Sequence, residues 1–214
     1  MRVLIIAPDQ PGISSISEVR LIQSWHHTST LNGYVTAEDV FRACQETAFD
    51  IIHFATHGGP EGVALSGGVL LTREDVAQAC RLKETQELLF NSCRTGALAS
   101  YAVRHGVRTA ISAEVDLPDV DAWKLPSVFY SARRNGHAGD PVGAYIMADS
   151  GDGEYALHVS PVYIQELQAA AALAGTRPHD ALVVSPRLAV LFAAGTLGVS
   201  AILSLIINLL AGRW

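Results

Sequence analysis

The chain is poor in the residues that mark several common classes of protein. Its 214 residues include three cysteines, Cys44, Cys80 and Cys93, and no two of them form a Cys-x-x-Cys pair. This pattern argues against a disulfide framework and favours a reducing compartment. Basic residues are also scarce, with 15 Lys and Arg against 21 Asp and Glu, and they form no cluster. We therefore expect no nucleic-acid partner.

The first residues lack the features of a secretion signal. The apolar run at residues 3–7 is too short for one, and the sequence Pro-Asp-Gln-Pro-Gly at residues 8–12 is typical of a turn after a first strand. We therefore expect the domain to face the cytoplasm.

Charged residues are absent from one long stretch near the C-terminus, residues 188–212. As a helix it would be about 35–38 Å long, more than the roughly 30 Å of a bilayer's hydrocarbon core. Arg187 precedes it, and Arg213 and Trp214 follow it, where interfacial anchors belong. The stretch predicts a single transmembrane helix that anchors the chain in the cell membrane. The flanking arginines balance, so charge does not set its orientation.

Small residues within this stretch, such as Gly195 and Gly198, suit contact with a second helix. A lipid-facing role fits them equally well, so a homo-oligomer is left open.

Apolar runs and amphipathic segments alternate along the rest of the chain, which predicts an α/β fold. We expect strands at residues 2–7, 17–23, 50–56, 87–92, 107–113 and 155–164, the last interrupted by Pro161. We expect helices at residues 36–44, 72–80, 97–105, 123–134, 141–148 and 165–174, and a short hairpin at residues 65–71. The alternation predicts a mostly parallel sheet covered by helices.

Two of the expected strands lead directly into residues that carry chemistry. The run at residues 50–56 ends before His57-Gly58, and the run at residues 87–92 ends before Cys93. Reactive groups collect at the carboxyl ends of parallel strands. The sequence therefore predicts that His57 and Cys93 meet at one sheet edge as the pair of a cysteine hydrolase.

A thiol becomes a strong nucleophile when a histidine takes its proton. The backbone N–H groups of Gly58 and Cys93 are suited to bind the oxyanion that forms next. His53 lies two residues deeper in its strand, where we expect it buried and bonded to backbone. Cys44 and Cys80 lie on apolar helical faces and are expected to be buried. We expect neither a metal nor another cofactor.

The sequences His-Phe-Ala-Thr-His-Gly-Gly at residues 53–59 and Ser-Cys-Arg-Thr-Gly at residues 92–96 resemble the bacterial CHAT branch of the caspase-like peptidases, which is similar to separase. The stretches 106–111 and 129–136 also resemble that family, and the likeness covers residues 1–165. It implies a caspase-like three-layer sandwich. It also implies His57 as general base, Cys93 as nucleophile and no third catalytic group.

The sequence departs from many relatives just before the nucleophile. Asn91-Ser92 stands where an aspartate often helps to bind a basic substrate residue, in the S1 pocket. Carboxylates at positions 114, 116, 119 and 121 follow the next strand, in a loop that borders this pocket in the family. Glu114 and Asp116, nearest the strand end, are the candidates for S1, and they would favour Arg or Lys at P1. An ordinary solvated acidic loop remains the alternative.

Together these features divide the chain into a caspase-like (CHAT) peptidase domain at 1–165, a helix and linker at 166–187 and a transmembrane helix at 188–212. We expect a membrane-anchored cysteine endopeptidase that cuts a protein substrate. The resemblance implies an effector of bacterial defence or programmed cell death, switched on by a separate sensor or activator protein. Two alternatives stay open: a non-catalytic membrane-tethered adaptor, and a pore-forming effector that acts through an oligomerised transmembrane helix.

Overall fold

The computed structural model describes residues 1–118, 122–135, 141–148 and 154–173. Within these ranges no helix is long and apolar enough to cross a membrane. The expected transmembrane segment, residues 188–212, lies outside the described residues, as do Asp119 and Asp121.

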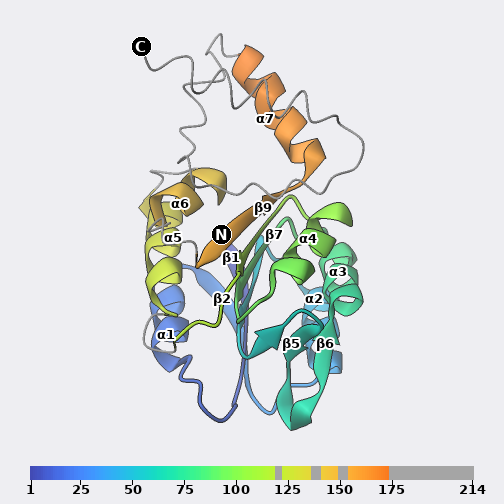
Figure 1. Cartoon of the computed structure of the whole chain (residues 1–214), viewed down its shortest axis with the longest axis vertical. Helices are drawn as coiled ribbons and strands as arrows, with labels where there is room; N and C mark the ends of the chain where they lie inside the picture. The colour runs from blue at the N-terminus through green and yellow to red at the C-terminus, as the bar shows by residue number, and fades with distance from the viewer. Residues whose placement is uncertain (119–121, 136–140, 149–153, 174–214) are drawn as a thin grey trace.

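A six-stranded sheet forms the centre of the molecule (Figure 1). In spatial order its strands are β2 (His27–Gly33), β1 (Arg2–Pro8), β3 (Ile51–Ala55), β7 (Glu87–Asn91), β8 (Thr109–Ala113) and β9 (Tyr155–Val159). Neighbouring strands are parallel except β9, which runs antiparallel to β8. The prediction of a mostly parallel sheet is confirmed.

Helices cover both faces of this sheet. On one face lie α1 (Ile16–Trp25), α5 (Lys124–Asn135) and α6 (Pro141–Ala148), and on the other lie α2 (Ala37–Glu46), α3 (Arg73–Leu82) and α4 (Gly96–Arg104). The helix α7 (Pro161–Leu173) follows β9. The result is a three-layer α/β/α architecture.

Side chains of the central strands alternate between two separate cores. Ile5 and Ile51 pack with the helices on the α1 side, whereas Leu4 and Ile52 pack with those on the α2 side. Burial on both faces explains why these strands are continuous apolar runs in the sequence.

Two helices begin as the sequence predicts. Thr36 caps α2 and Thr72 caps α3, and in each case an aspartate at the third helical position completes a capping box. These reciprocal bonds satisfy backbone N–H groups that the first turn leaves without partners.

The expected strand at residues 17–23 is wrong, because this segment belongs to helix α1. Its buried residues, Glu18 and Ile22, are four positions apart and so share one helical face. The second strand of the chain is instead β2, which lies at the edge of the sheet and has no buried residue.

The expected strand at residues 155–164 is too long. The strand β9 ends at Val159, and Pro161 is the first residue of α7. Ser160 precedes it, and its hydroxyl accepts the backbone N–H of Tyr163. A serine cap followed by proline is a favoured helix start, so the proline begins an element here. The helix therefore crosses the domain boundary expected at residue 165.

A small second sheet lies beside the carboxyl ends of the central strands (Figure 1). It contains β4 (Gly58–Gly59), β5 (Gly62–Ala64) and β6 (Leu70–Thr72), joined in antiparallel pairs. The hairpin expected at residues 65–71 therefore spans residues 62–72 instead. Most of the predicted range forms the loop between β5 and β6.

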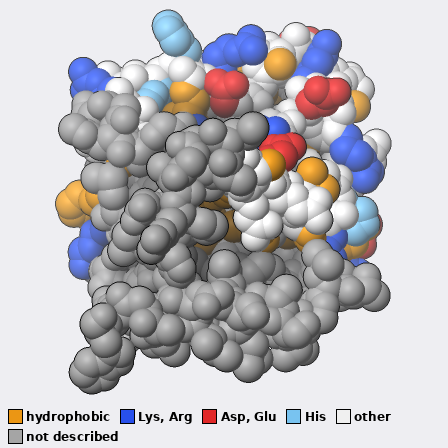
Figure 2. Space-filling view, turned by 90° about the horizontal axis from the view of Figure 1, so that it is seen from above, with side chains coloured by type: hydrophobic (Ala, Val, Ile, Leu, Met, Phe, Trp, Pro, Cys, Tyr) orange, Lys and Arg blue, Asp and Glu red, His pale blue; other side chains and the backbone are white. Residues whose placement is uncertain are grey.

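The end of the molecule nearest α7 is seen in Figure 2. Over its described residues, acidic and basic side chains lie interspersed, with only small apolar patches between them. This mixture is typical of a surface in contact with water.

Candidate active site

His57 and Cys93 follow neighbouring parallel strands at matched positions. Ala55 of β3 is paired with Asn91 of β7. Each candidate residue lies two positions beyond its paired strand end, His57 after β3 and Cys93 after β7. The register thus brings both side chains to the same edge of the sheet.

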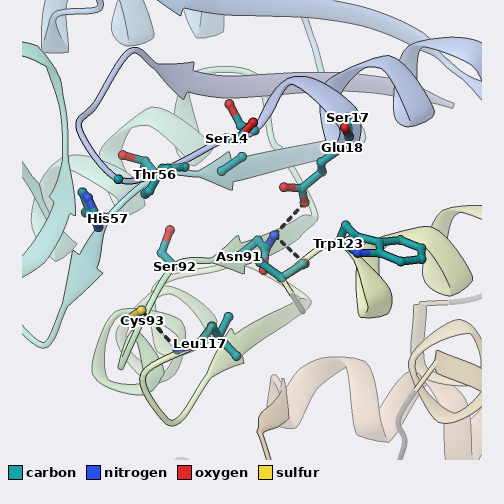
Figure 3. A pocket seen from close by; sticks show the side chains of 15 residues that line it. Ser14, Ser17, Glu18, Thr56, His57, Asn91, Ser92, Cys93, Leu117 and Trp123 are labelled. Atoms are coloured by element: carbon teal, nitrogen blue, oxygen red, sulfur yellow. Dashed lines mark hydrogen bonds between the residues drawn. The ribbon is translucent and has the colours of Figure 1, made fainter. Parts of the chain in front are cut away.

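Both side chains line one cavity, with a volume of about 430 Å³ (Figure 3). This is within the roughly 300–1,000 Å³ of ligand pockets. Four segments form its walls: the loop after β1 with the start of α1, the end of β3, the end of β7, and the region around Leu117 and Trp123. The polar or aromatic side chains on these walls are Ser14, Ser15, Ser17, Glu18, Thr56, His57, Asn91, Ser92, Cys93 and Trp123.

Gly58 lies against the turn that carries Cys93. A Cβ atom at Gly58 would stand 2.7 Å from Cβ of Ser92, 2.8 Å from Cγ2 of Thr95 and 3.2 Å from the carbonyl oxygen of Cys93. Only glycine permits this approach. The next residue, Gly59, has open space where its Cβ would be. The glycine beside His57 is therefore required by packing against the cysteine turn.

The exposed His57 ring is held from one side by backbone. Its Nε2 lies 3.0 Å from the carbonyl oxygen of Pro11, in the loop after β1. Because a carbonyl only accepts, Nε2 carries the proton in this contact, which leaves Nδ1 of the neutral ring able to take one.

Gln10 fixes the backbone of the same residue. Its Oε1 accepts the backbone N–H of His57 at 3.1 Å, while its Nε2 donates to the carbonyl of Leu65 at 3.3 Å. The loop after β1 thus supports the histidine through Gln10 and Pro11, two contacts that the sequence analysis did not predict.

The half-buried Cys93 occupies a tight turn between β7 and α4. Its Sγ accepts the backbone N–H of Leu117 at 3.3 Å. The next residue, Arg94, has φ +51°, a left-handed conformation that non-glycine residues seldom adopt. Buried Thr95 closes the turn by donating its hydroxyl to the carbonyl of Ser92 at 2.9 Å. Strain of this kind is often found at functional sites.

The two acidic candidates for S1 do not line the cavity. Asp116 is exposed and forms an ion pair with Arg94. The carboxylate of Glu114 lies over Gly96 at the start of α4, so close that a Cβ there would be 2.5 Å from its Oε1. Buried His158 and the hydroxyl of Ser112 also bond to Glu114 and hold the pKa of this carboxyl below its usual range.

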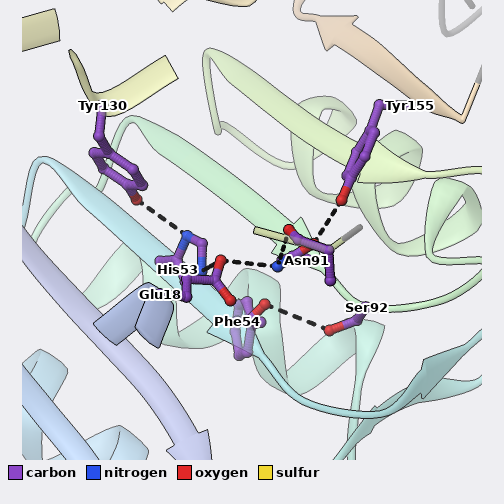
Figure 4. A network of polar contacts seen from close by, with 8 residues as sticks. Glu18, His53, Phe54, Asn91, Ser92, Tyr130 and Tyr155 are labelled. Carbon is purple, nitrogen blue, oxygen red and sulfur yellow. Dashed lines mark hydrogen bonds and ion pairs between the residues drawn. The ribbon is translucent and has the colours of Figure 1, made fainter. Parts of the chain in front are cut away.

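A different carboxylate, Glu18, lines the cavity although the sequence analysis did not single it out. It is 5% exposed, and its Oε1 accepts the side-chain amide of Asn91 at 2.8 Å. His53 Nε2 lies 2.8 Å from the same oxygen (Figure 4). The only sequence clue was the four-residue spacing of Glu18 and Ile22, which indicates a helical face.

His53 is buried as expected, but its partners are side chains rather than backbone. Its Nδ1 lies 3.1 Å from the hydroxyl of Tyr130 on α5. Burial raises the pKa of Tyr130 well above its usual value, so this phenol keeps its proton. Asn91 is held in turn by the hydroxyl of Tyr155, which donates to its Oδ1 at 2.6 Å.

The other two cysteines are buried in the core on the α2 side. Burial raises the pKa of the Cys44 thiol to about 11, and that of Cys80 is also raised. Neither lies at the cavity. Among the residues that the structure describes, no three His, Cys, Asp or Glu side chains gather as a metal site requires.

Comparison with known proteins agrees with this geometry. The family model of the CHAT domain matches residues 9–141, more than half of the chain. The matched region includes His57, Gly58 and Cys93 together with the walls of the cavity. No curated protein matches the chain.

Proposed function

Because the chain belongs to the CHAT domain family, a family of caspase-like cysteine peptidases, we propose that it is a cysteine endopeptidase with a dyad of His57 and Cys93. One observation carries the proposal. The two residues follow neighbouring parallel strands and line the same cavity, with Gly58 in close contact with the cysteine turn.

The first half of the reaction forms an acyl-enzyme. Nδ1 of His57 takes the thiol proton of Cys93, and the thiolate attacks the scissile carbonyl carbon. The backbone N–H groups of Gly58 and Cys93 stabilise the resulting oxyanion. His57 then gives its proton to the leaving amine, the peptide C–N bond breaks, and a thioester to Cys93 remains.

The second half releases the enzyme. His57 takes a proton from a water molecule, which attacks the thioester carbonyl, and the thiolate leaves and recovers a proton. Pro11 supports both halves because its carbonyl keeps the proton of the neutral ring on Nε2, away from the thiol. No third catalytic side chain takes part.

We further propose that residues 188–212 anchor this domain in the cell membrane, with the domain in the cytoplasm. The length and lack of charge of that segment support the anchor. Cell fractionation tests it: the full chain should resist carbonate extraction from membranes, and a chain ending at residue 187 should be released. Equal extraction of both would contradict the anchor.

We propose that the peptidase acts as an effector of bacterial defence or cell death, switched on by a separate sensor protein. An unregulated peptidase would harm its own cell, which is the reason to expect such a partner. The CHAT family match supports the peptidase, and the effector role is the hypothesis to be tested.

The decisive experiment is a profile of new protein N-termini in cells that express the chain with its neighbouring sensor and trigger. Wild type should produce cleavage sites that are absent with Cys93→Ala and with His57→Ala. Identical profiles and identical cell survival for wild type and Cys93→Ala would contradict proteolysis and favour the adaptor. Dye leakage that persists in Cys93→Ala would favour the pore.

A further inference from the structure

The cavity contains a charge that the proposed reaction does not use. Glu18 is 5% exposed and lines the same cavity as Cys93, from the start of α1. Charged groups are rarely buried unless they have a partner. No Lys or Arg is among the described residues that line the cavity.

Two side chains lie against the Glu18 carboxylate: Asn91, which donates to it, and His53, whose Nε2 lies 2.8 Å from Oε1. The Tyr130 hydroxyl lies 3.1 Å from Nδ1 of His53 on the other side of the ring. Asn91 is a neutral donor, and its own oxygen is already bonded to Tyr155. The network in Figure 4 therefore fixes the orientation of the Glu18 carboxylate.

Both neighbours face the same carboxylate oxygen. Asn91 donates to Oε1, His53 Nε2 lies 2.8 Å from it, and none of the described residues donates to Oε2. In Figure 3 the second oxygen of Glu18 points away from Asn91, toward the side of the cavity where Ser92 is drawn. One oxygen is thus fixed by the protein and the other is available to a ligand.

Trp123 adds a second recognition element. It is 51% exposed and lines the same cavity. The face of an indole ring attracts cations, most often a guanidinium group. An arginine side chain combines a planar fork for a carboxylate with a flat surface for stacking, which lysine lacks.

We propose that Glu18 is the specificity carboxylate of this site and selects substrates with arginine at P1. This inference rests on the proposed cysteine peptidase activity and names its substrate class. It replaces Glu114 and Asp116 as the source of charge, because the carboxylates of those residues have other partners away from the cavity. Asn91 acts as a positioning residue that orients Glu18.

The test uses peptidyl acyloxymethyl ketones, which alkylate a catalytic thiol, with arginine, citrulline or leucine at P1. Citrulline has nearly the shape of arginine and no charge. The full 214-residue chain is treated with each probe, and the rate of Cys93 modification is measured by mass spectrometry. A charge-assisted hydrogen bond to a buried carboxylate predicts arginine faster than citrulline by about tenfold or more.

Glu18→Gln keeps an oxygen that can accept from Asn91 but removes the carboxylate. It should bring the arginine-to-citrulline ratio close to one. Glu18→Asp should retain a preference for arginine. Asp116→Asn is the matched control, since it removes an acidic group outside the cavity, and its ratio should equal that of wild type.

Two results would overturn the proposal. The first is an arginine-to-citrulline ratio near one in the wild-type protein. The second is a ratio in Glu18→Gln equal to that of wild type. Failure of the peptidase assignment gives a different result: Cys93 would then be modified by none of the probes, even in cells that supply the sensor and its trigger. That outcome would remove both proposals together.

Discussion

At the scale of single residues, the candidate site depends on a close backbone contact at Gly58, a residue that has no side chain. Gly58 touches Ser92, Thr95 and Cys93, so the histidine segment and the cysteine turn are packed against each other. Arg94, with its left-handed backbone, lies in the same turn. Small changes in this contact should therefore alter both the stability of the protein and the reactivity of Cys93.

Gly58→Ala should destabilise the protein by about 1–3 kcal/mol, since its methyl group meets backbone and side-chain atoms at 2.7–3.2 Å. It should also slow modification of Cys93 by the arginine probe. Urea unfolding and the probe rate measure the two effects.

Gly59→Ala is the matched control, because a methyl group there meets nothing within 4 Å. Its stability should stay within about 0.5 kcal/mol of wild type. Equal losses in the two variants would show that Gly58 has no special contact with the cysteine turn.

The sequence predicted the residues whose signal is local. His57, Gly58 and Cys93 each stand next to an apolar run, so their positions at strand ends could be inferred. Glu18 could not be placed at the cavity, because its approach to Asn91 spans 73 positions and depends on α1 packing across the sheet. The contact from Pro11 is made by a backbone carbonyl, which any residue type possesses.

At the scale of elements, the starts of two helices were predicted reliably and the element with weak alternation was not. The helices that begin after Thr36 and Thr72 were predicted at these positions, where capping bonds lie within one turn. Residues 17–23 were predicted as a strand because their apolar residues alternate weakly. Over so few positions, the same pattern also fits an amphipathic helix. The proline at 161 was taken as an interruption although it begins α7, since proline suits a first helical position.

Thr72→Ala should destabilise the protein by about 0.5–2 kcal/mol, because it removes the acceptor of the Asp75 N–H and half of the capping box. Thermal or urea unfolding measures the loss. Ser15→Ala is the control at an N-cap that makes no side-chain bond in α1, and it should cost less. A larger loss at Ser15 would contradict this assignment of the caps.

At the scale of the whole molecule, the sheet separates two cores and its carboxyl edge carries the cavity. Cys44 and Cys80 belong to one core, and Cys93 lies at the edge. Burial that raises the pKa of Cys44 to about 11 leaves almost no thiolate there at neutral pH. The architecture thus packs two cysteines into the core and leaves Cys93 at the cavity.

The central claim is that His57 activates Cys93, and the rate of thiol alkylation at pH 7 tests it most directly. Iodoacetamide should modify Cys93 at least about tenfold faster in wild type than in His57→Ala, because an ordinary thiol is only a few per cent thiolate at this pH. Cys44 and Cys80 should remain unmodified in both proteins, which verifies that both are folded. Equal rates at Cys93 in the two folded proteins would contradict the account.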